Sequence, residues 1–181
     1  MRGLLSTLVV CAVAIGVLHA QAGPKPAATA APVMVLETDK GAIEIQLYQA
    51  DAPKSVAHIV ALVNRSFYRS QRFHRVTPTL IQFGDPLSRN MTQMQAWGVG
   101  NSNSPIGVAE ITKKRRHVLG AVSMAYPGSD KLLADSQFFI MRRPAPEYDG
   151  KYTVFGKVLK GMDVVAKIER GDVLKRAYLK E

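Results

Sequence analysis

Cysteine is almost missing from this chain, which has one among 181 residues, and that one lies where export would remove it. Cys11 falls inside an apolar run from Leu4 to Leu18 that follows the basic Arg2 and precedes the small residues Ala20-Gln21-Ala22. A basic start, an apolar stretch too short for a comfortable membrane span and an A-x-A site together predict a signal peptide over residues 1–22. Cleavage would leave no cysteine, which excludes disulfide bridges and thiol chemistry. We expect an exported chain, periplasmic or secreted, with no membrane span after cleavage.

The rest of the chain is long enough for one domain with a real core. Residues 23–32 are rich in alanine and proline without periodicity, so a flexible linker is expected there. The composition is ordinary for a globular protein, with 47% hydrophobic and 21% charged residues. We therefore expect one domain over residues 33–181, acting as a monomer.

Motifs for breaking covalent bonds are also lacking. The chain contains no G-x-S-x-G, no H-E-x-x-H and no phosphate-binding P-loop. Its four histidines do not have the spacing of metal ligands. We therefore expect no metal, no other cofactor and no covalent nucleophile.

Acidic residues are scarce, at 14 against 24 basic ones, which gives a net charge of +10. The sharpest basic patch is Lys113-Lys114-Arg115-Arg116. Such a surface favours acidic partners, phosphate or anionic membrane, although a run of like charge is more commonly a solvated loop. No nucleic-acid recognition motif accompanies the patch, so nucleic acid is not an expected partner.

Apolar alternation and turn residues predict a mainly β fold with two helices. One helix should span residues 51–64, with Asp51 as its cap, and the other residues 161–169. The long glycine- and proline-bearing segment 86–116 should be functional, because structureless loops of this length are uncommon in compact domains. About eight short strands linked by turns suit a closed eight-stranded antiparallel β-barrel capped by the two helices. Eight strands are expected over residues 33–38, 42–48, 68–76, 80–83, 118–125, 136–141, 152–159 and 173–179, and a further short strand is expected inside the long segment at residues 108–111.

Two of the expected strands carry a polar residue inside an apolar run. Arg75 lies within Phe73-His74-Arg75-Val76, and Gln137 lies within Ser136-Gln137-Phe138-Phe139-Ile140. A guanidinium buried in such a strand without hydrogen bonds would cost several kcal/mol. The fold must therefore either satisfy Arg75 or leave it on an outer face.

The chain resembles the cyclophilins, which are peptidyl-prolyl cis-trans isomerases, and in particular their short bacterial exported kind. The resemblance covers residues 33–179 and includes the opening hairpin of residues 33–48. The other matching segments are Ala52-Pro53-Lys54-Ser55-Val56-Ala57, Phe73-His74-Arg75-Val76, Gln82-Phe83-Gly84-Asp85-Pro86, Gly120-Ala121-Val122-Ser123-Met124-Ala125, Ser136-Gln137-Phe138-Phe139-Ile140 and Asp149-Gly150-Lys151-Tyr152-Thr153-Val154-Phe155-Gly156.

The resemblance implies a substrate groove on the outer face of an eight-stranded barrel. Arg75 matches the catalytic arginine of the family, and Gln137 matches a glutamine that contacts the substrate backbone. Phe139 matches the floor of the proline pocket. The other expected substrate-binding residues are Phe73, His74, Leu80, Ile81, Gln82, Ala125, Tyr126 and Tyr148.

The reaction that the resemblance implies needs no nucleophile. Rotation about the bond before proline breaks no covalent bond, yet it faces a barrier of about 18–20 kcal/mol from amide resonance. As the amide twists, the prolyl nitrogen regains a lone pair. A guanidinium N–H aimed at that lone pair binds the transition state better than the planar ground state. The expected partners are proline-containing segments of exported or unfolded client proteins, whose folding the enzyme would assist.

Three departures from the family pattern affect the proline pocket. The run from Arg75 to Gln82 is one residue shorter than usual, so counting from Arg75 assigns Leu80 and Ile81 to the pocket, whereas counting back from Gln82 assigns Thr79 and Leu80. Glu147 replaces a tryptophan found in many eukaryotic members. Tyr148 stands where a pocket leucine is usual. The shortened segment motivates an alternative function, a non-catalytic peptide-binding chaperone module.

Overall fold

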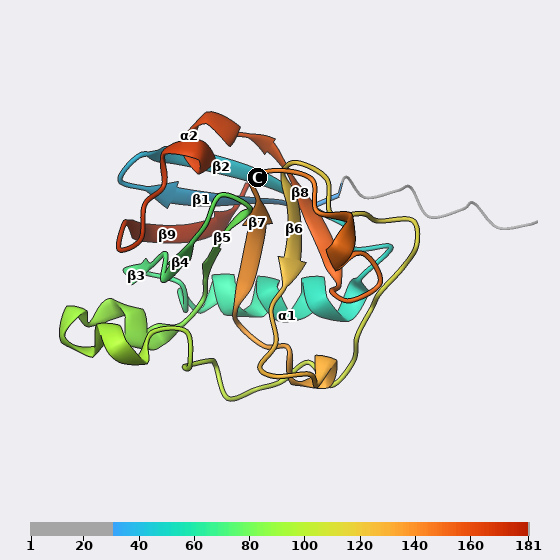
Figure 1. Cartoon of the computed structure of the whole chain (residues 1–181), viewed down its shortest axis with the longest axis horizontal. Coiled ribbons are helices and arrows are strands. Elements are labelled where there is room, and N and C mark those ends of the chain that lie inside the picture. Colours follow the sequence, from blue (N-terminus) through green and yellow to red (C-terminus); the bar gives the residue numbers. More distant parts are fainter. Residues whose placement is uncertain (1–30, 181) are drawn as a thin grey trace, which may run out of the picture.

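The computed structural model describes residues 31–180, so the expected signal peptide and most of the expected linker lie outside the described residues. The described part contains one antiparallel sheet and two α-helices (Figure 1). The helices are α1 (Pro53–Asn64) and α2 (Met162–Lys167), and four short 3-10 turns are η1 (Pro86–Arg89), η2 (Met91–Ala96), η3 (Lys131–Leu133) and η4 (Pro146–Tyr148). The strands are β1 (Val33–Thr38), β2 (Gly41–Leu47), β3 (Gln71–Arg72), β4 (Arg75–Val76), β5 (Leu80–Phe83), β6 (Ala121–Met124), β7 (Phe138–Met141), β8 (Val154–Lys160) and β9 (Val173–Leu179).

The strand order shows how the sheet curls. It runs β3-β9-β1-β2-β8-β6-β7-β5-β4, so the two edge strands are β3 and β4. Only Phe73 and His74 separate these strands along the chain. The expected mainly β fold is therefore confirmed, with one expected strand divided into β3 and β4. Among the described strands no ladder joins β3 to β4. The two edges of the curled sheet are therefore linked only by the backbone of residues 73–74, and the hydrogen bonds do not form a closed barrel.

Side-chain alternation gives the central strands two buried faces. On β7, Phe138 and Ile140 belong to the interior core, whereas Phe139 and Met141 belong to a second apolar cluster. This second cluster, which we call the outer cluster, consists of Leu80, Ala121, Phe139, Met141, Ala145 and Val154, with Tyr48, Ala125, Tyr148 and Tyr152 packed against it. Because successive side chains of a strand point to opposite faces, the outer cluster lies on the convex side of the curled sheet.

The two helices pack at opposite ends of the central strands (Figure 1). Val56, Ile59 and Leu62 of α1 join the interior core, as do Val165 and Ile168 at the α2 end. Of the helices in residues 31–180, none has the length and apolarity needed to cross a membrane.

The start of α1 differs from its expected form. Asp51 does not cap the helix: the N-cap residue is Ala52, without a side-chain bond, and Asp51 instead binds Lys114 and Arg115. The backbone N–H groups of Lys54 and Ser55 donate to the carboxylate of Glu110 at 2.9 and 2.8 Å. An anion at a helix start satisfies unpaired donors and interacts favourably with the helix dipole. A residue remote in sequence therefore replaces the local cap.

Glu110 also explains why residues 108–111 are not the expected strand. These residues form no ladder. The segment instead runs past the N-terminal start of α1 and places the Glu110 carboxylate there. The Glu110 N–H donates to the Thr153 hydroxyl at 3.0 Å, so the segment is held by side chains and not by strand pairing.

Gly84, which follows β5, offers a test of the packing between this turn and the start of β7. Its φ is +105°, and an added Cβ would lie 2.2 Å from the carbonyl oxygen of Ser136. Gly171 has a similar φ of +98° but open space around its Cβ position. We expect Gly84→Ala to lower the free energy of unfolding by about 3 kcal/mol, the combined cost of left-handed strain and overpacking. Gly171→Ala should lose only about 1 kcal/mol. Urea denaturation of both variants measures the difference, and equal losses would contradict the packing argument.

Candidate active site

The ladder between β4 and β5 places Arg75 on the outer face. Arg75 pairs with Gln82, and Val76 pairs with Ile81. Paired residues project to the same side of a sheet. Ile81 is buried in the interior core and Val76 packs against it, so Arg75 and Gln82 point outward. Arg75 is exposed, although its apolar neighbours in the sequence suggested a buried strand. Its guanidinium therefore carries no desolvation penalty that other groups must offset.

A chain of side-chain hydrogen bonds runs from Arg75 across the outer face. A guanidinium N–H of Arg75 donates to Gln82 Oε1 at 3.2 Å, and Gln82 Nε2 donates to Gln137 Oε1 at 2.9 Å. Gln137 Nε2 then donates to the carbonyl oxygens of Gly98 and Gly100 at 2.9 and 2.7 Å. The two glutamines expected at the site are therefore in direct contact. An arginine side chain has five N–H donors. The hydrogen bond to Gln82 uses only one of the five donors of Arg75.

A cavity of about 270 Å³ lies beside this chain of amides. It brings together four residues expected to bind substrate: Gln82, Ala125, Tyr126 and Gln137. The Ala125 N–H donates to the Gln137 carbonyl at 2.9 Å, which ties the two walls of the cavity together. The Tyr126 hydroxyl donates to the Lys151 carbonyl at 3.1 Å.

Three more expected site residues, Leu80, Phe139 and Tyr148, meet in the outer cluster. Leu80 is therefore the residue of its strand that faces the expected pocket. Thr79 lies in the preceding turn, where its carbonyl accepts from the Arg142 N–H at 2.7 Å and its hydroxyl accepts from Arg143 Nε at 3.0 Å.

The pocket floor is almost completely covered by aromatic side chains. Phe139 is 2% exposed and Leu80 is 1% exposed. The ring of Phe139 makes edge contacts with Tyr148 and Tyr152 at centroid distances of 5.9 and 5.3 Å. In this arrangement almost none of the Phe139 surface is open to a proline ring.

Two expected substrate-binding residues have side chains on the wrong face. Phe73 and Ile81 are completely buried in the interior core, and the Phe73 ring lies 5.0 Å from that of Phe83. Alternation explains Ile81, because its neighbours Leu80 and Gln82 take the outer face. Phe73 lies inside while Arg75 lies outside because the strand breaks at residues 73–74, between β3 and β4. Neither side chain can contact a peptide on the outer face.

His74 is buried beside the loop that receives Gln137. It is 6% exposed, and its ring nitrogens have no hydrogen-bond partner within residues 31–180. A Cβ on Gly98 would lie 3.5 Å from the His74 ring, an ordinary contact distance, so the φ of +97° and not the space is what favours glycine at this position. Burial lowers the pKa of His74 from 6.5 to about 4, which makes the ring neutral at pH 7.

Beneath Phe139 lies a buried network that the sequence analysis missed. His117 Nδ1 lies 2.9 Å from Asp149 Oδ1, and His117 Nε2 lies 2.9 Å from the Ser123 hydroxyl. The imidazole stacks on the Phe139 ring at a centroid distance of 6.1 Å. The atom order is that of a Ser-His-Asp triad, but Ser123 is completely buried, so no substrate can reach it. Burial lowers the pKa of His117, and the hydrogen-bonded imidazole packs against the Phe139 ring and supports it.

Comparison with known proteins agrees with this geometry. Residues 33–180 match the family described as cyclophilin type peptidyl-prolyl cis-trans isomerase/CLD. Peptidyl-prolyl cis-trans isomerase B of Bacillus subtilis is 37% identical over 138 residues, which cover 76% of this chain and 90% of the relative. A probable peptidyl-prolyl cis-trans isomerase of Brucella suis is 36% identical over 99% of this chain and 90% of its own length.

A solved structure shares the fold. The cyclophilin type peptidyl-prolyl cis-trans isomerase of Cryptosporidium parvum superposes with a TM-score of 0.72 at 23% identity, covering 83% of this chain and 98% of the other. The chain therefore belongs to the cyclophilin-type peptidyl-prolyl cis-trans isomerases. It is an enzyme that accelerates rotation about X-Pro bonds.

The buried His74 predicts a loss of stability in mild acid. Its pKa is lower in the folded chain than the ordinary value of 6.5, so the unfolded chain binds more protons between about pH 6.5 and pH 4. The associated stability is present above pH 6.5 and is lost as the pH falls through this window. The free energy of unfolding should fall by about 2–3 kcal/mol more in the parent chain than in His74→Gln between pH 7 and pH 4.5. Urea denaturation at both pH values measures this, and parallel losses in the two chains would show that His74 does not contribute.

Proposed function

We propose that Arg75 is the catalytic residue of this isomerase and that its clients are exported, unfolded chains. The observation that carries the first part is the position of the Arg75 guanidinium. It lies on the outer face, is held by Gln82 and retains N–H donors for a ligand. Such a donor can bind the lone pair that the prolyl nitrogen acquires only during rotation, which lowers the barrier without any change in covalent bonds.

The surroundings of Arg75 favour a bound peptide. The amide chain through Gln82 and Gln137 restricts the side chains around the arginine, so little ordering is needed when the peptide arrives. The Oε1 atom of Gln137 accepts one bond from Gln82 and can accept a second from a peptide N–H. The cavity walled by Ala125 and Tyr126 offers room for a client residue next to the proline.

The covered pocket floor gives the alternative function a structural basis. Because Tyr148 and Tyr152 cover Phe139, a client segment could bind on the tyrosines without seating its proline. The chain would then act as a peptide-binding chaperone module in addition to its isomerase activity.

Substitution of Arg75 separates the two functions. We expect Arg75→Ala to lower kcat/KM for a proline tetrapeptide by about 10²–10³-fold, the loss seen when one preorganised donor is removed. Arg143→Ala is the matched control, because Arg143 is exposed in the neighbouring turn and binds only Thr79 in the described chain. Isomerisation measured by NMR exchange, with circular dichroism to show an intact fold, gives the result. Unchanged turnover in Arg75→Ala would refute the catalytic assignment. Lost turnover together with unchanged suppression of client aggregation would show that the chain also acts as a chaperone module.

The export part of the proposal rests on residues 1–22, whose basic start, apolar run and A-x-A site form a signal-peptide pattern. Expression of the full chain in a Gram-negative host should yield a soluble periplasmic product. Mass spectrometry should show that this product begins at Gly23. An uncleaved product retained in the cytoplasm would contradict export.

A further inference from the structure

A second hollow, of about 310 Å³, lies beside the outer cluster and is lined by four basic residues. These are Lys114, Arg115, Arg116 and Lys157. Its apolar floor is formed by Tyr48, Val118, Ala121 and Val154. We call it the basic hollow. Its volume is at the lower end of the range for ligand sites in proteins.

Part of the basic hollow is held in a fixed arrangement. The Arg115 guanidinium stacks on the Tyr48 ring, 3.5 Å from its centroid, and Arg115 Nε donates to Asp51 Oδ2 at 2.7 Å. Lys114 Nζ donates to the other oxygen of Asp51 at 2.8 Å. One carboxylate thus holds two cations, so a positive charge remains at this wall after Asp51 is counted.

The other two cations have no such partner. Lys157 makes no ion pair within residues 31–180, and its ladder partner is Ala121 of the outer cluster, so its side chain projects over the same face. Arg116 approaches Asp149 only at 4.0 Å, and its side chain is 72% exposed. Asp149 already accepts from His117. Arg116 and Lys157 are therefore available to an incoming anion.

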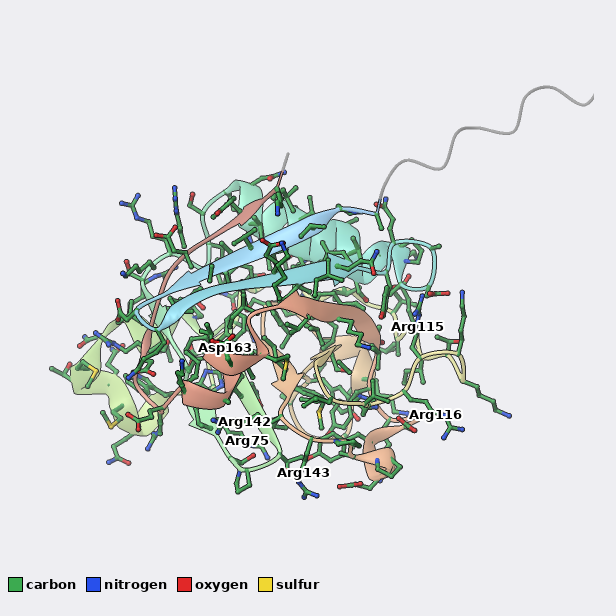
Figure 2. The ribbon with its side chains drawn as sticks, turned by 90° about the horizontal axis from the view of Figure 1, so that it is seen from above. Arg75, Arg115, Arg116, Arg142, Arg143 and Asp163 are labelled. Carbon is green, nitrogen blue, oxygen red and sulfur yellow. The ribbon has the colours of Figure 1, made fainter. Side chains whose placement is uncertain are left out.

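The basic hollow is within reach of a peptide bound at Arg75. Ala121 and Val154 belong to its floor and also to the outer cluster that contains Phe139. Four strand intervals separate β4, which carries Arg75, from β8, which carries Lys157. At about 4.8 Å per interval this is roughly 20 Å, the length of about six extended residues. Figure 2 shows Arg115 and Arg116 on one side of the molecule and Arg75 at another edge, beside Arg142 and Arg143.

We propose that the basic hollow binds acidic side chains of the client, three to six residues away from the proline that Arg75 acts on. The proposal rests on the proposed function, because the occupant is the same chain that enters the active site. The concave shape and apolar floor suit peptide side chains, whereas a bilayer is flat. Charge complementarity then makes the enzyme prefer prolines with a nearby acidic stretch.

Matched peptides test this preference. One set carries a proline core with four glutamates placed three to six residues before or after it, and a second set carries glutamines at the same positions. The variant is Arg116→Gln with Lys157→Gln, which leaves the Asp51 contacts intact. The control is Lys167→Gln with Lys175→Gln, which removes the same charge from α2 and β9. KM and kcat are measured by NMR exchange at 20 mM and 500 mM salt.

We expect the parent enzyme to show a KM about three- to tenfold lower for the better glutamate peptide than for its glutamine match at low salt, from two or three exposed ion pairs. The preference should fall to less than twofold in Arg116→Gln/Lys157→Gln and at high salt, and it should persist in the control variant. The kcat for the glutamine peptide should be equal in all three proteins.

Equal KM values for the two peptide sets in the parent enzyme would overturn the proposal, as would a preference that survives in Arg116→Gln/Lys157→Gln. The parent enzyme could also show no preference for glutamate peptides and instead bind phosphatidylglycerol vesicles or single-stranded RNA. If Arg116→Gln/Lys157→Gln lost that binding, the proposal would be overturned and the hollow would be assigned to that partner. Failure of the parent enzyme to turn over the glutamine peptide would instead contradict the proposed function and leave no basis for a client-directed site.

Discussion

Alternation of side chains along β5, β6, β7 and β8 is the constraint on which this structure depends. Each strand sends one set of residues into the curled sheet and the other set outward: the inward set is apolar, and the outward set supplies both the apolar outer cluster and polar residues such as Gln82. On the outer face the apolar residues of these strands pack together, with Tyr48, Tyr148 and Tyr152 packed against them. The register of β4 on β5 then decides the face of Arg75. A slip of one residue would turn this guanidinium toward the core, so the register of this ladder keeps Arg75 accessible on the outer face.

The local parts of the fold could be predicted from the sequence. The strands over residues 33–38, 80–83 and 173–179 have the expected bounds, and α1 ends at the expected Asn64. These elements depend on periodicity and turn residues within a few positions. The family resemblance assigned both Gln82 and Gln137 to the substrate site, and the structure joins their side chains by a hydrogen bond that the sequence did not predict.

The parts that could not be predicted depend on contacts between distant residues. The carboxylate of Glu110 caps α1 across more than fifty positions, and His117 finds Asp149 across 32 positions. No local pattern records either contact. Asp51 looked like a cap because aspartate before proline often is one, but two basic residues from segment 86–116 compete for it more strongly. The ambiguity between Thr79 and Ile81 as the pocket neighbour of Leu80 had a different cause, because two ways of counting differed by one residue. Only the observed strand could decide it: Leu80 faces outward, Ile81 faces the interior core and Thr79 lies in the preceding turn.

The position of β9 also sets the order in which this chain can fold. Its residues 173–179 lie between β3 and β1 in the sheet, although they follow all other described strands in the sequence. A ribosome that adds about 5–20 residues per second completes β1 several seconds before it reaches β9. During that time β1 and β3 each lack a partner on one side, and unpaired strand edges invite association with other chains. The sheet of this isomerase therefore cannot be completed until synthesis is nearly over, and the unfinished chain would itself benefit from protection until then.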